Sequence, residues 1–137
     1  MLVYLCRHAQ AAQADPGEPD DLRPLTPTGE EQAARLGESL AAEAQAAPAV
    51  VVSSPLLRAR QTAALVARAT GAELRVDARL APGAGVDELR AIVGELNGPV
   101  AAVGHQPDCS EIVVALTGRD PGFPPAGVAT IELELDP

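Results

Sequence analysis

Several residue types are scarce or missing in this chain of 137 residues. Lysine and tryptophan are absent, so all ten basic residues are arginine, and the only aromatic residues are Tyr4 and Phe123. The two cysteines, Cys6 and Cys109, make no disulfide framework and no CxxC pair, which favours the reducing cytoplasm. No apolar run approaches the roughly 20 residues of a membrane span, and the N-terminus lacks the pattern of a signal peptide.

Positive charge is also in short supply. The chain has 19 acidic and 10 basic residues, which give a formal net charge of −9. Such a chain repels polyanions at long range, so nucleic acids and anionic membranes are disfavoured as partners. Apolar residues make up 47% of the sequence, enough for a hydrophobic core, and the length suits one domain. We therefore expect residues 1–137 to form a single domain.

Short apolar segments alternate with segments of helical periodicity along the whole chain. The expected strands are 2–6, 49–52, 73–76, 99–103 and 128–135, and the expected helices are 27–47, 56–70, 86–96 and 108–116. This alternation predicts one three-layer α/β domain, with helices on both faces of a mostly parallel sheet. The last strand alternates apolar and polar residues and so has one more polar face, which predicts an antiparallel strand at the sheet edge.

Both histidines directly follow expected strands. His8 comes after the first strand and His105 after the fourth. Ligands of open α/β sheets bind beyond the carboxyl ends of the strands, so the two imidazoles should share one pocket. Arg7 lies beside His8, and Arg58 lies in the first turn of the helix after the second strand, which is the same sheet edge.

The chemistry of this edge suits a phosphoryl group. An arginine fork grips phosphoryl oxygens two at a time, and a helix N-terminus adds free N–H groups and partial positive charge. An imidazole near its ordinary pKa of about 6.5 offers a neutral nitrogen as a nucleophile at cytoplasmic pH. A pocket with this much positive charge is not expected by chance in a chain with a net charge of −9, and a phosphoryl group is the simplest ligand for it.

Four motifs, in order, resemble those of the histidine phosphatase superfamily, which has the phosphoglycerate-mutase-like fold. LCRHAQA resembles the RHG signature, LTPTGEEQA the start of the next helix, SSPLLRARQTA the second motif and VGHQP the second histidine motif. The short length and the final FPPAGVATIEL resemble the compact bacterial branch of SixA-like phosphohistidine phosphatases. One departure is Ala9, which replaces the family's glycine, and a left-handed backbone there would cost more than with glycine.

The resemblance implies a role for each matching residue. His8 would be the nucleophile that becomes phosphorylated, and His105 would complete the phosphate cage. Arg7 and Arg58 would hold the phosphoryl oxygens, whereas Arg23 would either approach the phosphate or be an ordinary loop residue. No metal or other cofactor is required, because the arginines supply the counter-charge. We also predict that the second ring nitrogen of His8 donates to a backbone carbonyl or a carboxylate.

The general acid is missing from its usual place. Larger family members carry a glutamate on an insertion that this chain shortens to LAPGAGVDEL, and neither Asp87 nor Glu88 can be assigned to its role. His105, Asp20 and Asp21 are the other candidates. An alkoxide leaving group needs protonation, whereas an imidazole needs far less help. The favoured substrate is therefore phosphohistidine, on a protein or as a small phosphoramidate.

The leading hypothesis is a metal-independent phosphatase that forms a phosphohistidine at His8. The alternatives are a small phosphomonoesterase acting on a metabolite phosphate, a noncatalytic phospho-binding module and a metal-dependent site. Cys6 and Cys109 are expected to be buried as small apolar residues rather than to bind zinc. A mutase is disfavoured, since nothing in the sequence resembles a lid that would keep water from an intermediate. A phosphohistidine-bearing protein is the expected partner, and the oligomeric state stays open.

Overall fold

The structure is a computed structural model that describes residues 1–135, so the last two residues of the expected domain lie outside the described residues. Its strands are β1 (Leu2–Arg7), β2 (Val50–Ser53), β3 (Glu73–Val76), β4 (Val100–Gly104) and β5 (Val128–Glu132). Its α-helices are α1 (Pro27–Ala41), α2 (Leu57–Thr70), α3 (Val86–Gly94) and α4 (Asp108–Thr117). Two short 3₁₀ helices, η1 (Asp20–Leu22) and η2 (Ala78–Leu80), lie in the connections.

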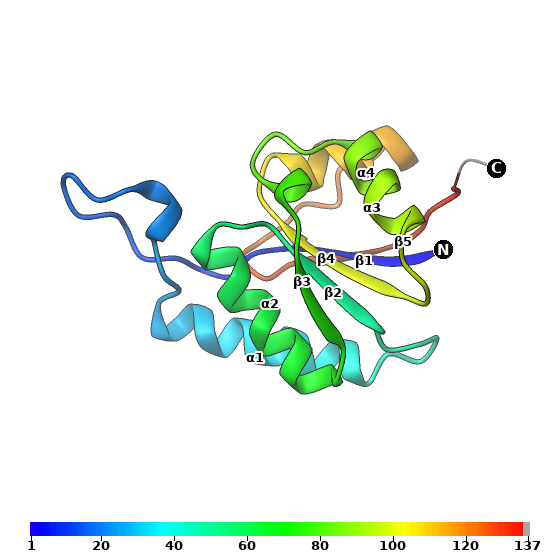
Figure 1. The fold of residues 1–137 in the computed structure, drawn as a ribbon, viewed down its shortest axis with the longest axis horizontal. Helices are drawn as coiled ribbons and strands as arrows, with labels where there is room; N and C mark the ends of the chain where they lie inside the picture. Colours follow the sequence, from blue (N-terminus) through cyan, green and yellow to red (C-terminus); the bar gives the residue numbers. More distant parts are fainter. Residues whose placement is uncertain (136–137) are drawn as a thin grey trace.

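The five strands form one sheet in the order β3-β2-β4-β1-β5 (Figure 1). Neighbouring strands are parallel except for β5, which pairs antiparallel with β1 at the edge. The mostly parallel sheet and the antiparallel edge strand are therefore as predicted. Every residue of β2 and β4 is buried, because these strands are central in the sheet and covered on both faces.

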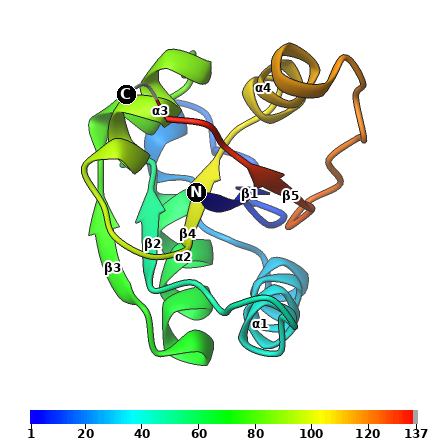
Figure 2. The same ribbon diagram turned by 90° about the vertical axis from the view of Figure 1, so that its right-hand side faces the viewer.

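Helices cover both faces of the sheet, which confirms the three-layer prediction. Figure 2 shows α1 and α2 on one face and α3 and α4 on the other. The alternation of side chains along β1 sends Val3 and Leu5 into the core under α3 and α4. The same alternation sends Tyr4 and Cys6 into the core under α1 and α2. Within residues 1–135, every helix is too short or too polar to cross a lipid bilayer.

Three elements end earlier than the sequence predicts. Helix α1 ends at Ala41 rather than near residue 47, because the chain must turn back toward β2. The hydroxyl of the buried Tyr4 donates a hydrogen bond to the Ala46 carbonyl, which fixes this turn outside the helix. This tertiary demand overrides the helix propensity of alanine. Helix α3 ends at Gly94, and the next residues close in tighter i→i−3 bonds. Strand β5 stops at Glu132 because β1, its only partner, begins at Leu2.

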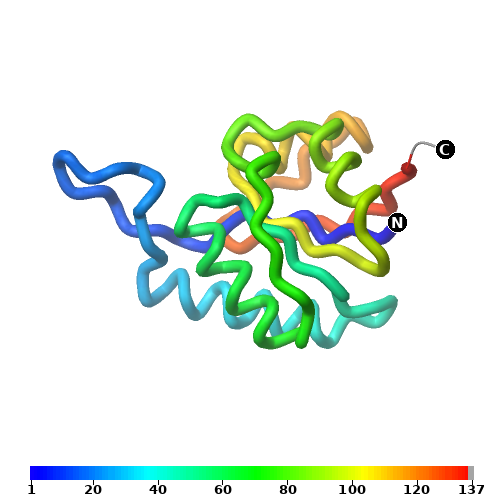
Figure 3. Tube along the Cα trace, viewed as in Figure 1, coloured from blue at the N-terminus to red at the C-terminus, as the bar shows by residue number. Residues whose placement is uncertain are grey.

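The segment between β1 and α1 projects from the α/β body, and we call residues 9–24 the arm. Figures 1 and 3 show the arm extending away from the carboxyl ends of the strands. Its two sides are joined near the body, where the Ala12 N–H donates to the Pro24 carbonyl at 2.8 Å. Beyond that bond the arm carries η1, which has no buried residue.

Candidate active site

The two histidines meet at the carboxyl end of the sheet. His8 directly follows β1 and His105 directly follows β4, and these strands are neighbours with Arg7 paired to Gly104. The His8 N–H donates to the Gly104 carbonyl at 3.0 Å, which aligns the two strand ends. The centroids of the two imidazole rings are 5.3 Å apart, with the ring planes tilted by 56°. Residues almost a hundred positions apart therefore form one site.

The His8 ring has a defined hydrogen-bonding state. Its Nδ1 lies 2.7 Å from the Ala9 carbonyl oxygen, which can only accept, so Nδ1 carries the proton and Nε2 keeps its lone pair. This is the predicted bond to a backbone carbonyl. Burial lowers the pKa of His8, and the nearby positive charges, Arg58 foremost, lower it further against the opposing effect of the Ala9 bond. The imidazole is therefore neutral at pH 7.

Ala9 is held by a residue that the sequence analysis did not single out. Its backbone N–H donates to Thr62 Oγ1 at 3.0 Å, and this hydroxyl donates to the Arg58 carbonyl at 2.8 Å. The contact links the β1 end to α2 and so orients the carbonyl that binds His8. Ala9 is fully buried, and the only non-glycine residue with positive φ in residues 1–135 is Ala126. The expected backbone cost of replacing the family's glycine is therefore not incurred.

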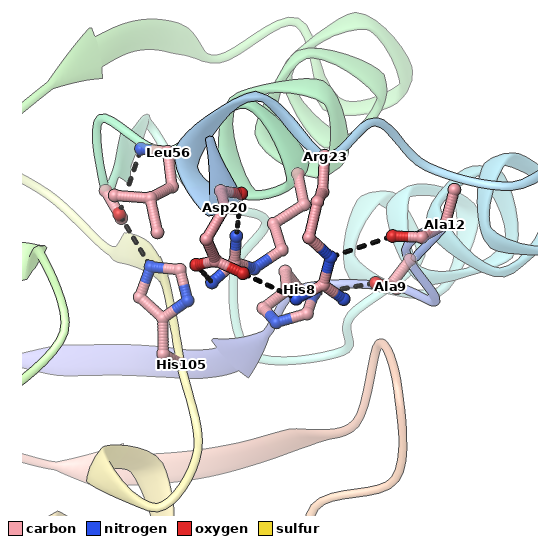
Figure 4. A network of polar contacts seen from close by, with 9 residues as sticks. His8, Ala9, Ala12, Asp20, Arg23, Leu56 and His105 are labelled. Carbon is pink, nitrogen blue, oxygen red and sulfur yellow. Dashed lines mark hydrogen bonds and ion pairs between the residues drawn. The ribbon is translucent and has the colours of Figure 1, made fainter. Parts of the chain in front are cut away.

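His105 is oriented by Ser54, a residue just before α2. Its Nε2 lies 2.7 Å from Ser54 Oγ, which also accepts from the Leu56 N–H at 3.2 Å. The Ser54 hydroxyl has no other acceptor among residues 1–135, so it donates to Nε2 and the ring proton sits on Nδ1. In Figure 4 the His105 ring turns its other nitrogen toward His8 and Asp20. Burial, followed by His8 and Arg58, lowers the pKa of His105 to about 4.

The arginines surround the histidines in two different ways. Arg7 donates from Nη1 to the Phe123 carbonyl at 2.8 Å, and its buried Nε has no partner in the described chain. Arg58 is 7% exposed and donates to Asp20 from both terminal nitrogens, to the carbonyl at 3.0 Å and to Oδ2 at 3.2 Å. Arg23 joins the same carboxylate at 2.8 Å and also donates to the Ala12 carbonyl. Arg23 is thus connected to the site through Asp20 (Figure 4).

The LTPTGEEQA motif supports the chain that follows His8. The Thr26 hydroxyl accepts from the Gly29 N–H at 2.9 Å, which caps the first turn of α1. A Cβ on Gly29 would lie 2.0 Å from the Gln10 carbonyl oxygen, so only glycine lets α1 approach this backbone. The motif therefore positions the start of the arm and supplies no group to the chemistry.

The cysteines and the acids near α3 do not enter this site. Cys6 and Cys109 are free and almost fully buried, as predicted, and burial raises the pKa of the Cys109 thiol to about 12. In the described part of the chain, no three histidine, cysteine, aspartate or glutamate side chains are grouped to hold a metal ion. Glu88 accepts from the Gly85 N–H at 2.8 Å and so caps α3.

Sequence comparison places this site in a known family. Residues 3–83 match the family model of the histidine phosphatase superfamily (branch 1). An uncharacterised protein of Mycobacterium tuberculosis (strain ATCC 25618 / H37Rv) is 35% identical over 141 residues, which cover 93% of this chain and 86% of that protein. The chain therefore belongs to the histidine phosphatase superfamily and is a phosphatase, as its motifs predicted.

Solved structures narrow the similarity to one branch. SixA from Agrobacterium tumefaciens is 32% identical with a TM-score of 0.81, over 94% of this chain and 88% of that one. The protein histidine phosphatase SixA in complex with tungstate is 27% identical with a TM-score of 0.84, over 98% of this chain and 89% of that one. Within the superfamily, the chain is thus similar to the SixA branch, as predicted.

Proposed function

We propose that this phosphatase hydrolyses phosphohistidine through a covalent phosphohistidine intermediate at His8. The observation that carries the proposal concerns two nitrogens. Among residues 1–135, the only buried side-chain nitrogens or oxygens without a partner are Arg7 Nε and His105 Nδ1, and both belong to this site. An unpaired buried donor costs about 1–3 kcal/mol, so two of them beside His8 favour a ligand rich in acceptor oxygens. A phosphoryl group has that chemistry.

In the first step, the lone pair of His8 Nε2 attacks phosphorus in line with the leaving group. The new N–P bond forms as the bond to the substrate imidazole breaks, and positive charge develops on the His8 ring. The substrate imidazole, protonated on its other nitrogen, keeps the electron pair of the broken bond and leaves as a neutral ring. The Ala9 carbonyl, 2.7 Å from Nδ1, stabilises this charge. The guanidinium groups of Arg7 and Arg58 face the negative charge of the phosphoryl oxygens, and His105 Nδ1 adds a neutral donor.

In the second step, water attacks the phosphorus of the intermediate. The Nε2–P bond breaks, His8 returns to its neutral form and both protons of the water stay on the phosphate product. Splitting the displacement in this way replaces one difficult step by two easier ones. The step needs positioning and positive charge, which the arginines supply, so we propose that no metal takes part.

The protonation states around the site support a leaving group of low basicity. The hydrogen bond from Arg23, with the charge of Arg58, lowers the pKa of Asp20, so this carboxylate is ionised at pH 7. His105 is neutral there because its pKa is about 4. Neither residue is a strong acid for an alkoxide, whereas an imidazole leaving group needs little protonation. The similarity to a protein histidine phosphatase favours the same substrate class.

The proposal extends to the partner and the compartment. A phosphohistidine-bearing protein is the substrate that we propose, since the site lies at the open end of the sheet. The two free, buried thiols are consistent with the reducing cytoplasm, which we propose as the location.

The test is to trap the intermediate with radiolabelled phosphoramidate and to map the label. We expect acid-labile, base-stable label on His8, no label in His8→Ala and no loss of activity in the presence of a chelator. Label on another residue would refute the nucleophile, and inhibition by the chelator would refute metal independence. Rates on phosphoramidate and on alkyl phosphates test the substrate class. Faster hydrolysis of the alkyl esters would favour the metabolite phosphomonoesterase instead.

A further inference from the structure

The carboxylate of Asp20 accepts hydrogen bonds from two arginines beside the histidines, Arg23 and Arg58. Its Oδ1 accepts from Arg23 Nη1 at 2.8 Å and its Oδ2 from Arg58 Nη2 at 3.2 Å. Its backbone carbonyl accepts from Arg58 Nη1 at 3.0 Å. In the view of Figure 4 this side chain lies between the rings of His105 and His8. Both terminal nitrogens of Arg58 are therefore in contact with Asp20.

A carboxylate and a phosphoryl group make the same contacts with arginine. Each presents two oxygens to the guanidinium fork, and each gains from its positive charge. The arginines beside Asp20 lower the pKa of its carboxyl group, so it is negatively charged at neutral pH. One anion of the chain itself thus already occupies donors of the phosphate-binding arginine.

We propose that Asp20 is an internal competitor that weakens the binding of oxyanions at Arg58, the inorganic phosphate product among them. This inference rests on the proposed function for the identity of the product. A phosphorylated protein substrate adds contacts outside the arginine cluster, whereas free phosphate has only the arginines and imidazoles. Displacement of Asp20 from Arg58 costs either ligand the same free energy, but the substrate keeps its additional contacts. The competition therefore leaves free phosphate the more weakly bound of the two, and it favours product release.

The position of Asp20 allows this exchange without loss of the core. Its side chain is 60% exposed, and η1 buries no residue, so packing does not hold the carboxylate in place. The arm is fixed to the body farther back, by the Ala12–Pro24 hydrogen bond and the bridge between Ala11 and Leu25. Asp20 can therefore yield its contacts with Arg58 to a phosphoryl group while the rest of the arm keeps its attachment.

The test compares Asp20→Asn with Asp21→Asn. The first variant keeps the size of the side chain and the backbone carbonyl that binds Arg58, but it removes the charge. The second removes the same charge from the next residue, whose carboxylate has no hydrogen bond or ion pair in residues 1–135. Calorimetry with inorganic phosphate gives the affinity, and product inhibition of phosphoramidate hydrolysis gives an independent inhibition constant.

We expect Asp20→Asn to bind phosphate about fivefold more tightly, the upper end of the scale for ion pairs at the surface, because only the carboxylate of this pair is exposed. It should also show stronger product inhibition. The gain should shrink at high salt, because exposed charges are screened. Asp21→Asn should bind phosphate like the unchanged protein. Equal or weaker binding by Asp20→Asn would overturn the proposal and mean that Asp20 organises the arginines. Because calorimetry needs no turnover, tighter binding together with a failed His8 label would refute the phosphohistidine chemistry alone.

Discussion

The candidate site has two parts that are held by different forces. The part at the strand ends is held by partly or fully buried hydrogen bonds, which join His8 to the Ala9 carbonyl, His105 to Ser54 and Arg7 to the Phe123 carbonyl. The part on the arm, with Asp20 and Arg23, is held by exposed ion pairs. Buried hydrogen bonds set direction and protonation, whereas exposed ion pairs contribute little energy and exchange readily. This difference agrees with our proposals, which assign the chemistry to the strand ends and the adjustment of affinity to the arm.

The largest expected effect is the change in activity with pH, which depends on the histidines at the strand ends. Burial lowers the pKa of both imidazoles, and that of His105 to about 4, so His8 stays neutral as the pH falls past 6.5. Below the pKa of His8, we expect kcat/KM to fall about tenfold per pH unit, as the nucleophile is protonated. Nitrogen NMR of the two rings checks this directly. An imidazole that titrates above pH 6.5 would contradict the assignment.

The same shifts predict the direction of a stability change. Both imidazoles take up protons at a higher pH in the unfolded chain than in the folded protein. The free energy of unfolding should therefore decrease as the pH falls from 6.5 toward 4. Denaturant titrations at several pH values provide the measurement, and a flat profile over this range would count against neutral buried imidazoles.

A smaller effect is expected when the orientation of His105 is disturbed. Ser54→Ala removes the hydroxyl that lies 2.7 Å from His105 Nε2, so the ring proton is no longer directed to Nδ1. We expect kcat to fall about tenfold, less than the roughly hundredfold or more that loss of a positioned donor itself costs, because the His105 ring remains. Ser54→Thr should restore part of the activity. Ser53→Ala is the matched control, because this buried hydroxyl donates to the Ser54 carbonyl instead. Equal activities of the two alanine variants would remove Ser54 from the mechanism.

The smallest effect should come from the arm. In residues 1–135, Arg23 donates hydrogen bonds only to Asp20 and to the Ala12 carbonyl, and its charge lowers the pKa of His8 less than that of Arg58 does. Arg23→Gln removes that charge. We expect kcat to be unchanged and KM for phosphoramidate to change by about fivefold or less, the range of exposed ion pairs. Steady-state kinetics at low and high salt separates the two constants. A loss in kcat of a hundredfold would mean that Arg23 belongs with the groups at the strand ends.

Much of this fold was predictable because its determinants are local. The apolar runs before Arg7 and before His105 mark central strands, and glycine after Thr70 ends a helix in the left-handed conformation. The error at the end of α1 has the opposite origin. Its alanines favour helix, but the path back to β2 and the bond between Tyr4 and Ala46 decide the matter.

The site shows the same division. Motif order and position after strands predicted, without coordinates, that both histidines lie near Arg7 and Arg58, and the structure brings these four residues together. The bonds from Ser54 to His105 and from Thr62 to Ala9 were not predicted, because each joins residues more than fifty positions apart. A serine or threonine near a helix start is explained well enough by capping, so the local pattern does not reveal a distant partner.

By itself, the sequence determined the alternation of strands and helices, the family and the residues that can carry phosphoryl chemistry. Those properties follow from periodicity and from residue type, which a linear pattern records. Only the tertiary structure decided which nitrogen of each histidine is protonated. It alone also placed Asp20, on the arm, in contact with Arg58, on α2. These properties depend on distances of about 3 Å between remote segments, because hydrogen bonds and ion pairs weaken steeply beyond that separation.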